Sequence, residues 1–176
     1  NIVRSLKVLG HTAATRDVAE LDRVLDNCVQ LLGRALRQRG RLHRSSPGGQ
    51  AVAAPAHSCT HAVLTCFLRA LQVLPRNDAE ARLVLSTTED GVGYFPDQKR
   101  ACATVELRYH GPAIAIPTTA MSQAAYDLAA SIGGHLTEEL QPDGARWTLR
   151  MPLSTGSPLP IERQVDLVAR VLVIDD

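Results

Sequence analysis

The sequence is poor in aromatic residues, which form 3% of its 176 residues, and its core must therefore rely on leucine, valine, isoleucine and alanine. It contains no apolar run near the length of about 18 residues that a membrane-spanning helix needs. Its net charge is only +1, so composition gives no reason to expect contact with nucleic acid or a membrane surface. With 45% hydrophobic and 21% charged residues, the chain has a globular composition.

The sequence also lacks the paired cysteine spacings of metal sites and redox motifs. No C-x-x-C occurs, and all four cysteines lie in apolar surroundings, which predicts buried, reduced thiols in a cytoplasmic protein. These cysteines are Cys28, Cys59, Cys66 and Cys102. His57 and His61 are four residues apart and could share a helix face, but no second ligand pair accompanies them. We therefore expect no metal site.

The N-terminal part of the chain has the pattern of two helices. Residues 1–9 resemble the end of an amphipathic helix, and Asp17 with Glu20 resembles a capping box that starts a second helix. The second helix carries a heptad pattern of apolar residues at Val18, Leu21, Leu25, Cys28, Leu32 and Ala35. Such a stripe needs another helix against it. Residues 1–42 are thus predicted to form a helical hairpin, which either dimerises into a four-helix bundle or packs on its own domain.

The rest of the chain predicts an α+β domain between two linkers. Residues 43–57 and the stretch after residue 154 have linker composition, and the domain is expected at 58–154. Helices are expected at 58–74 and 122–132, with Gly133 and Gly134 as C-terminal caps. Strands are expected at 81–87, 103–109, 135–140 and 146–153, with a hairpin connection at 89–100 and a turn at 141–144. This order favours helices layered on one antiparallel or mixed sheet, a two-layer sandwich.

Four stretches carry a resemblance to a known family. TCFLRALQVLP at 65–75 resembles the N-box helix of sensor histidine kinases, YHGPAI at 109–114 resembles their glycine box, and GGHLT with WTLRMPL resembles their closing strands. The chain is thus similar to the C-terminal region of a bacterial hybrid sensor histidine kinase. The hairpin resembles the end of the dimerisation and phosphotransfer bundle, residues 58–154 resemble the GHKL (Bergerat-fold) ATPase domain, and residues 155–176 resemble a linker and the first strand of a receiver domain.

The resemblance implies a role in two-component signal transduction or a phosphorelay. It implies a homodimer formed through the hairpin, docking of a response-regulator receiver domain in cis or in trans, and a cytoplasmic location with any membrane anchor upstream. The chain starts and stops within recognisable patterns, so we expect it to be part of a longer protein. The phosphoacceptor histidine is expected upstream of Asn1, because His11 falls between the two helices.

The motifs depart from the family pattern where the nucleotide chemistry is expected. The family's metal-binding asparagine falls on Arg69, and a guanidinium has no lone pair for Mg²⁺. The acid that binds adenine is replaced by Tyr109, which we expect to fill the adenine pocket, and a glycine is replaced by Ala113. The second glycine box should fall at 119–122, which reads TAMS, and only a short segment stands in place of the lid. Gly111, Pro112 and Ile114 remain as the remnant glycine box.

These departures leave three interpretations open. The first is a degenerate kinase core that has no catalytic residues, binds little or no ATP and needs no cofactor. The second is a histidine phosphotransfer protein with a lidless ATPase-like domain. The third is an active kinase with divergent boxes, dependent on ATP and Mg²⁺, for which EDGVG at 89–93, with Glu89 as its acid, is one candidate glycine box. An unrelated α+β domain is a further alternative.

Overall fold

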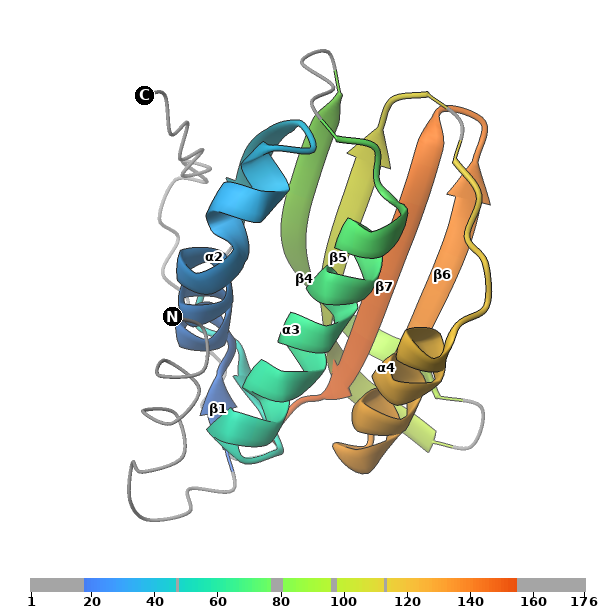
Figure 1. The fold of residues 1–176 in the computed structure, drawn as a ribbon. Coiled ribbons are helices and arrows are strands. Elements are labelled where there is room, and N and C mark those ends of the chain that lie inside the picture. Colours follow the sequence, from blue (N-terminus) through green and yellow to red (C-terminus); the bar gives the residue numbers. More distant parts are fainter. Residues whose placement is uncertain (1–17, 47, 77–80, 96–97, 113, 155–176) are drawn as a thin grey trace.

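The computed structural model describes residues 18–46, 48–76, 81–95, 98–112 and 114–154 (Figure 1). Within residues 89–100 it describes the backbone alone. The helices are α2 (Leu21–Arg37), α3 (Ala56–Val73) and α4 (Ala120–Ser131). The strands are β1 (Ala19–Glu20), β2 (Arg41–Ser45), β3 (Ala51–Val52), β4 (Arg82–Phe95), β5 (Gln98–His110), β6 (His135–Gln141) and β7 (Gly144–Pro152). None of the helices in these ranges is long and apolar enough to cross a membrane.

The architecture is a two-layer sandwich, as the sequence predicts. Five strands form one mixed sheet in the order β2-β4-β5-β7-β6, in which β2 runs parallel to β4 and the other neighbours are antiparallel. The three helices cover one face of this sheet (Figure 1). A two-stranded sheet of β1 and β3 lies beside it. The helices predicted at 58–74 and 122–132 and the strands predicted at 135–140 and 146–153 are confirmed within a few residues.

The core lies between the sheet and the helices. Alternate residues of the central strands are fully or almost fully buried on the helix side: Leu83, Leu85, Val105, Leu107, Tyr109, Trp147, Leu149 and Met151. Their neighbours in sequence point to the other face, because successive side chains of a strand alternate. That other face carries polar and charged residues, including Arg82, His110 and Arg146. We call it the open face of the sheet.

Helix α2 belongs to this core. Of the two arrangements left open for its apolar seam, a dimeric bundle or packing on its own domain, the structure has the seam packed within the domain against α3. Cys28 Sγ lies 3.8 Å from the carbonyl oxygen of Thr60. Leu21, Leu25 and Cys28 are fully buried there. The helix begins at Leu21, and its N-cap Glu20 makes no side-chain capping bond. Asp17, the other residue of the expected capping box, lies outside the described ranges. Residues 1–17, with the other half of the predicted hairpin, lie outside the described ranges.

The predicted linker at 43–57 contains ordered structure. Residues 41–45 form β2, whose backbone pairs with β4, and residues 51–52 form β3. The loop between them is held on α2 by Asp22, whose carboxylate accepts hydrogen bonds from Ser46 Oγ (2.6 Å) and from the Gly49 amide (3.1 Å). Glycine- and proline-rich composition suggested a linker, whereas strand pairing and this carboxylate organise the segment.

The hairpin of β4 and β5 is longer than the two strands predicted from sequence. Both strands extend through the predicted connection at 89–100, and their register shifts between Asp90 and Gly93. At the other end of the domain, Gly133 has a φ of 68° and Gly134 donates its amide to the Ala129 carbonyl (2.8 Å), so the predicted C-terminal cap of α4 is confirmed. Residues 155–176, with the predicted linker and receiver strand, lie outside the described ranges.

Candidate functional site

The glycine-box remnant and Arg69 both adjoin the connection between β5 and α4. Gly111 and Pro112 directly follow β5, and Arg69 lies on the C-terminal half of α3. Residues 111–119 then connect β5 to α4. The Gly111 amide donates to the Asp143 carbonyl oxygen (3.0 Å), which ties the start of this connection to the β6–β7 turn.

Arg69 is the central polar residue of this region. Its side chain is 1% exposed and forms a two-pronged ion pair with Glu138 on β6: Nε to Oε1 is 2.9 Å and Nη2 to Oε2 is 3.2 Å. Nη2 also donates to the carbonyl oxygen of Pro117 (2.6 Å). Arg69 thus joins α3, β6 and the connection before α4. Nη1 is buried and has no partner within the described part of the chain.

Burial makes this ion pair costly to form and costly to break. Removing two charges from water carries a desolvation penalty of several kcal/mol per ion, which good geometry and additional hydrogen bonds offset. Glu138 is 6% exposed on its side chain, so neither partner can regain solvation without structural change. Tyr126 on α4 lies close enough to be affected: burial and the charge of Glu138 raise the pKa of its phenol, and Arg69 opposes that rise.

Tyr109 fills space on the helix side of the glycine-box remnant. It is 1% exposed and lies at the end of β5. A Cβ atom at position 111 would lie 2.3 Å from Tyr109 Oη and 2.5 Å from Cζ, so the phenol ring rests against the Gly111 backbone. Only glycine fits this contact without displacing the ring. The packing of Tyr109 therefore accounts for the glycine at 111 independently of any ligand.

The N-terminus of α4 is closed by its own side chains. Thr119 Oγ1 accepts from the Ser122 amide (3.3 Å), and the Thr119 amide donates to Ser122 Oγ (3.2 Å), which together form a capping box. This is the position where the resemblance predicts a second glycine box. The preceding connection is anchored by Ile114 and Ile116, which pack partly buried against the core. The remnant residue Ile114 is therefore a packing residue.

The residues at these positions do not fit a magnesium–nucleotide complex. Mg²⁺ requires oxygen ligands, and the position assigned to the metal-binding asparagine holds a guanidinium already bound to Glu138 and Pro117. The adenine-contact position holds a buried tyrosine in place of a carboxylate. Within the described ranges, no group of three or more histidine, cysteine, aspartate or glutamate residues is placed to hold a metal ion. His57 and His61 do meet edge to face on α3, with ring centroids 6.4 Å apart.

The structure also identifies partners that the sequence did not reveal. Glu138 lies 69 residues after Arg69, and nothing in the local pattern of β6 distinguishes it from Glu139 beyond its place on the inward face of the strand. The stretch at 89–93, which we considered as an alternative glycine box, lies inside β4 and pairs antiparallel with β5. A third feature is the hydrogen bond between His110 Nδ1 and Asp143 Oδ2 (3.0 Å), on the open face.

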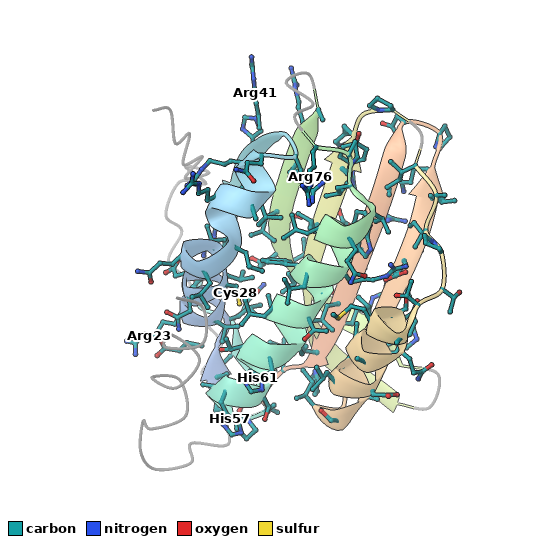
Figure 2. All side chains as sticks on the ribbon, viewed as in Figure 1. Arg23, Cys28, Arg41, His57, His61 and Arg76 are labelled. Atoms are coloured by element: carbon teal, nitrogen blue, oxygen red, sulfur yellow. The ribbon has the colours of Figure 1, made fainter. Side chains whose placement is uncertain are left out.

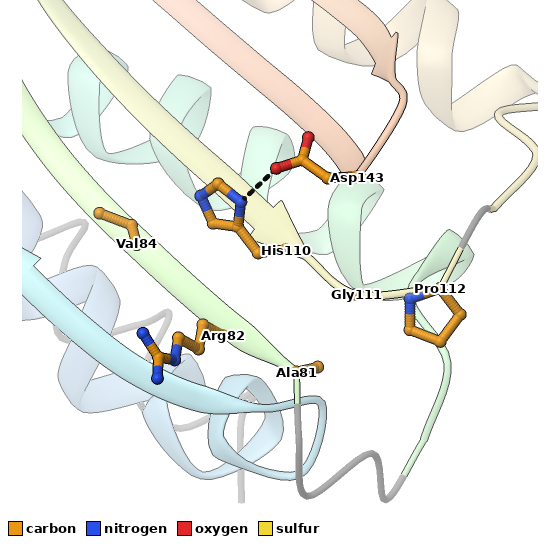
Figure 3. A pocket seen from close by; sticks show the side chains of 7 residues that line it. All are labelled: Ala81, Arg82, Val84, His110, Gly111, Pro112 and Asp143. Atoms are coloured by element: carbon orange, nitrogen blue, oxygen red, sulfur yellow. Dashed lines mark hydrogen bonds and ion pairs between the residues drawn. The ribbon is translucent and has the colours of Figure 1, made fainter.

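Gly111 and Pro112 line an open depression on the open face (Figure 3), with a volume of about 680 Å³. Its other lining residues are Ala81, Arg82, Val84, His110 and Asp143. Tyr109 and Arg69 belong to the opposite, helix-covered side of the sheet. The depression therefore shares Gly111 and Pro112 with the remnant glycine box but lies on the other face of the sheet from Arg69 and Tyr109.

Comparison with known proteins places the fold. No protein-family model and no curated protein sequence matches the chain. Solved structures do match. The histidine kinase AdeS of Acinetobacter baumannii superposes with a TM-score of 0.59 at 11% identity, covering 87% of this chain and 76% of that one. The catalytic domain of the histidine kinase ThkA in a nucleotide-free form gives 0.59 at 12% identity, covering 77% and 93%.

A third structure, full-length ShkA in complex with AMPPNP, gives a TM-score of 0.56 at 16% identity and covers 89% of this chain and 35% of that one. At these identities the likeness concerns the backbone arrangement. The match to an isolated catalytic domain over most of its length agrees with the mixed sheet and three helices described above. The chain therefore has the fold of the histidine kinase catalytic domain.

Proposed function

We propose that this chain is the catalytic-domain scaffold of a two-component sensor protein in which the nucleotide site is degenerate. In this role the domain binds little or no ATP and contributes to signalling by holding partner domains, including a receiver domain and a second copy. The fold supports the placement in this class, and the residues at the nucleotide positions support the loss of ATP binding.

One observation carries the proposal. Arg69 occupies the position that the resemblance assigns to the metal-binding asparagine, and its charge is bound to Glu138 in a buried pair. A cation at this position repels Mg²⁺, and freeing its guanidinium for phosphate would leave Glu138 unpaired in the core. Breaking such a pair costs about 3–5 kcal/mol. A ligand with a dissociation constant of 1 mM gains about 4 kcal/mol on binding. Breaking the pair would therefore cancel the binding free energy of such a ligand.

The contact between Tyr109 and Gly111 adds to this argument. The ring occupies the helix side of the glycine-box remnant, where adenine would be expected to lie. The capping box at Thr119 and Ser122 further engages backbone and side-chain groups at the start of α4. Each feature raises the cost of admitting a nucleotide.

The test is nucleotide binding by calorimetry. ATP and ADP with Mg²⁺ are titrated into the purified protein, and a nucleotide-binding histidine kinase catalytic domain is measured in the same buffer as a positive control. We expect no saturable heat at millimolar nucleotide. A dissociation constant in the micromolar range would overturn the degenerate assignment and require a rearranged Arg69.

A second candidate is a histidine phosphotransfer protein with a lidless ATPase-like domain. The short connection at 111–119 favours it, because the structure leaves no extended segment there to close over a nucleotide. This candidate is tested on the full-length protein with a phosphorylated receiver domain as donor. Acid-labile, alkali-stable phosphate on the protein would support phosphotransfer, whereas unmodified protein would leave the scaffold role.

A further inference from the structure

The open face of the sheet carries a row of basic side chains at one end. Arg41 on β2 is the register partner of Arg82 on β4, and Arg82 is in turn the partner of His110 on β5. Register partners lie side by side on one face of a sheet, where two like charges destabilise the pairing. No carboxylate within the described ranges pairs with Arg41 or Arg82. The fold therefore maintains a repulsive arrangement that a bound anion would relieve.

The depression lies beside this row. Arg82 and His110 line it together with the backbone-rich corner of Gly111 and Pro112 (Figure 3). Asp143 is the single acidic residue among the described residues of the lining, and it is engaged by His110 Nδ1 at 3.0 Å. Figure 3 shows the second ring nitrogen of His110 turned away from Asp143, toward the side where Val84 and Arg82 lie. The pair thus orients a ring nitrogen for contact with a ligand.

Further basic residues surround this end of the molecule. Figure 2 shows Arg41 and Arg76 at the same end of the sheet sandwich, whereas Arg23 lies far from them on α2. Burial lowers the pKa of Arg39, and the nearby charge of Arg76 lowers it further. Closely spaced cations raise the local electrostatic potential and attract anions.

We propose that this depression binds a phosphate group, as inorganic phosphate or as the phosphate monoester of a small molecule. The Arg82 guanidinium supplies charge and paired donors to the phosphate oxygens, and His110 supplies a ring nitrogen that can share a proton with them. The planar guanidinium fits tetrahedral oxyanions in two-point contact. A phosphate suits a lining in which, among the described residues, Arg82 has no carboxylate partner and the one acid, Asp143, is engaged by His110. The site lies on the opposite face of the sheet from Arg69 and Tyr109, and it does not depend on the proposed function.

The experiment is an NMR titration of the whole chain, labelled with ¹⁵N. Inorganic phosphate, glycerol 1-phosphate and acetate are added separately at constant ionic strength, because screening alone shifts exposed charges. We expect saturable shifts at the amides of Arg82, His110 and Gly111 with both phosphate probes, and weak, unsaturated shifts with acetate. Stronger binding of glycerol 1-phosphate than of inorganic phosphate would identify a monoester as the ligand class, and the reverse order would identify free phosphate.

Two substitutions make the assignment specific. Arg82→Gln removes an exposed charge from the depression, and Arg23→Gln removes an exposed charge from α2 as a matched control. We expect Arg82→Gln to weaken phosphate binding about tenfold, since a charge-assisted hydrogen bond is lost. Arg23→Gln should leave it within about twofold, because Arg23 does not line the depression and its exposed charge is paired with Glu20.

Three results would overturn the proposal. They are the absence of saturable shifts at tens of millimolar phosphate, equal binding of acetate and phosphate, and equal effects of the two substitutions. The third result would attribute any binding to net charge. Both substituted residues are exposed, and the dispersion of the amide spectrum verifies that each variant is folded.

Discussion

The ion pair of Arg69 and Glu138 gives the sharpest prediction about stability. Glu138→Gln keeps the shape of the side chain and one acceptor oxygen but removes the charge, which leaves a guanidinium that is 1% exposed without its counter-ion. Breaking a buried pair in this way costs about 3–5 kcal/mol, and we expect the lower end because the amide oxygen still accepts one hydrogen bond. The neighbouring Glu139→Gln is the matched control. Its carboxylate pairs with Arg146 while 47% exposed, so its loss should cost at most about 1 kcal/mol.

The assay is equilibrium unfolding in urea, followed by the fluorescence of Trp147, which is fully buried and is the single tryptophan of the chain. With a slope of about 2 kcal/mol/M, a loss of 3 kcal/mol lowers the midpoint by about 1.5 M, against about 0.5 M or less for the control. Equal midpoints for Glu138→Gln and Glu139→Gln would refute the assignment of a buried, structural ion pair.

A double variant keeps the prediction testable if Glu138→Gln does not fold. Arg69→Met with Glu138→Leu replaces the pair by apolar side chains of similar volume, and such replacements are neutral or stabilising in other buried pairs. We expect this variant to be more stable than Glu138→Gln. If the double variant unfolds as readily, the charge of Arg69 is not what makes the single change costly.

Three further predictions follow from local geometry. Gly144→Ala should lower the free energy of unfolding in urea by about 3 kcal/mol or more, because its Cβ would lie 1.9 Å from the Tyr109 carbonyl oxygen at a φ of 151°. The control Gly49→Ala, which has a φ of 79° and open space around the Cβ position, should lower it by about 1 kcal/mol. Similar losses for the two variants would contradict the steric argument. Thr119→Ala should lower the free energy of unfolding by about 1 kcal/mol, because the α4 cap is lost. Thr118→Ala, at the adjacent exposed residue, should change it by at most about 0.5 kcal/mol. Equal losses for the two variants would count against the cap. Burial raises the pKa values of Cys28 and Cys66 from the ordinary 9.0 to about 12 and that of Cys59 to about 11, so a thiol reagent at pH 8 should modify these three only after unfolding. Because the unfolded thiols lose protons first, the free energy of unfolding should fall as pH rises from about 9 through these values, and a flat profile there would contradict their burial.

The sequence was a good guide wherever a local pattern decides structure. The apolar periodicity of α3 and α4, the alternation in β6 and β7, and the glycine cap at Gly133 and Gly134 each depend on residues close together in the chain. The same patterns carried the resemblance to histidine kinases, and the solved structures confirm the corresponding fold.

The sequence was a weaker guide wherever the deciding partner is distant. The heptad pattern of α2 correctly predicted an apolar stripe but not that α3 would cover it. The composition of residues 43–57 predicted a linker and gave no sign of β2, because β2 is stabilised by pairing with β4 rather than by its own residue pattern. Pairing also decides the role of the glycines at 91 and 93, which lie in a strand rather than in a phosphate-binding loop.

By itself, the sequence determined the order and type of most elements and the identity of the residues that depart from the kinase pattern. Only the tertiary structure decided what those departures do: it joins Arg69 to Glu138 across 69 residues and places the Tyr109 ring on Gly111. The physical reason is that periodicity and capping involve neighbours in sequence, whereas charge compensation and close packing depend on which distant side chains share the same buried space.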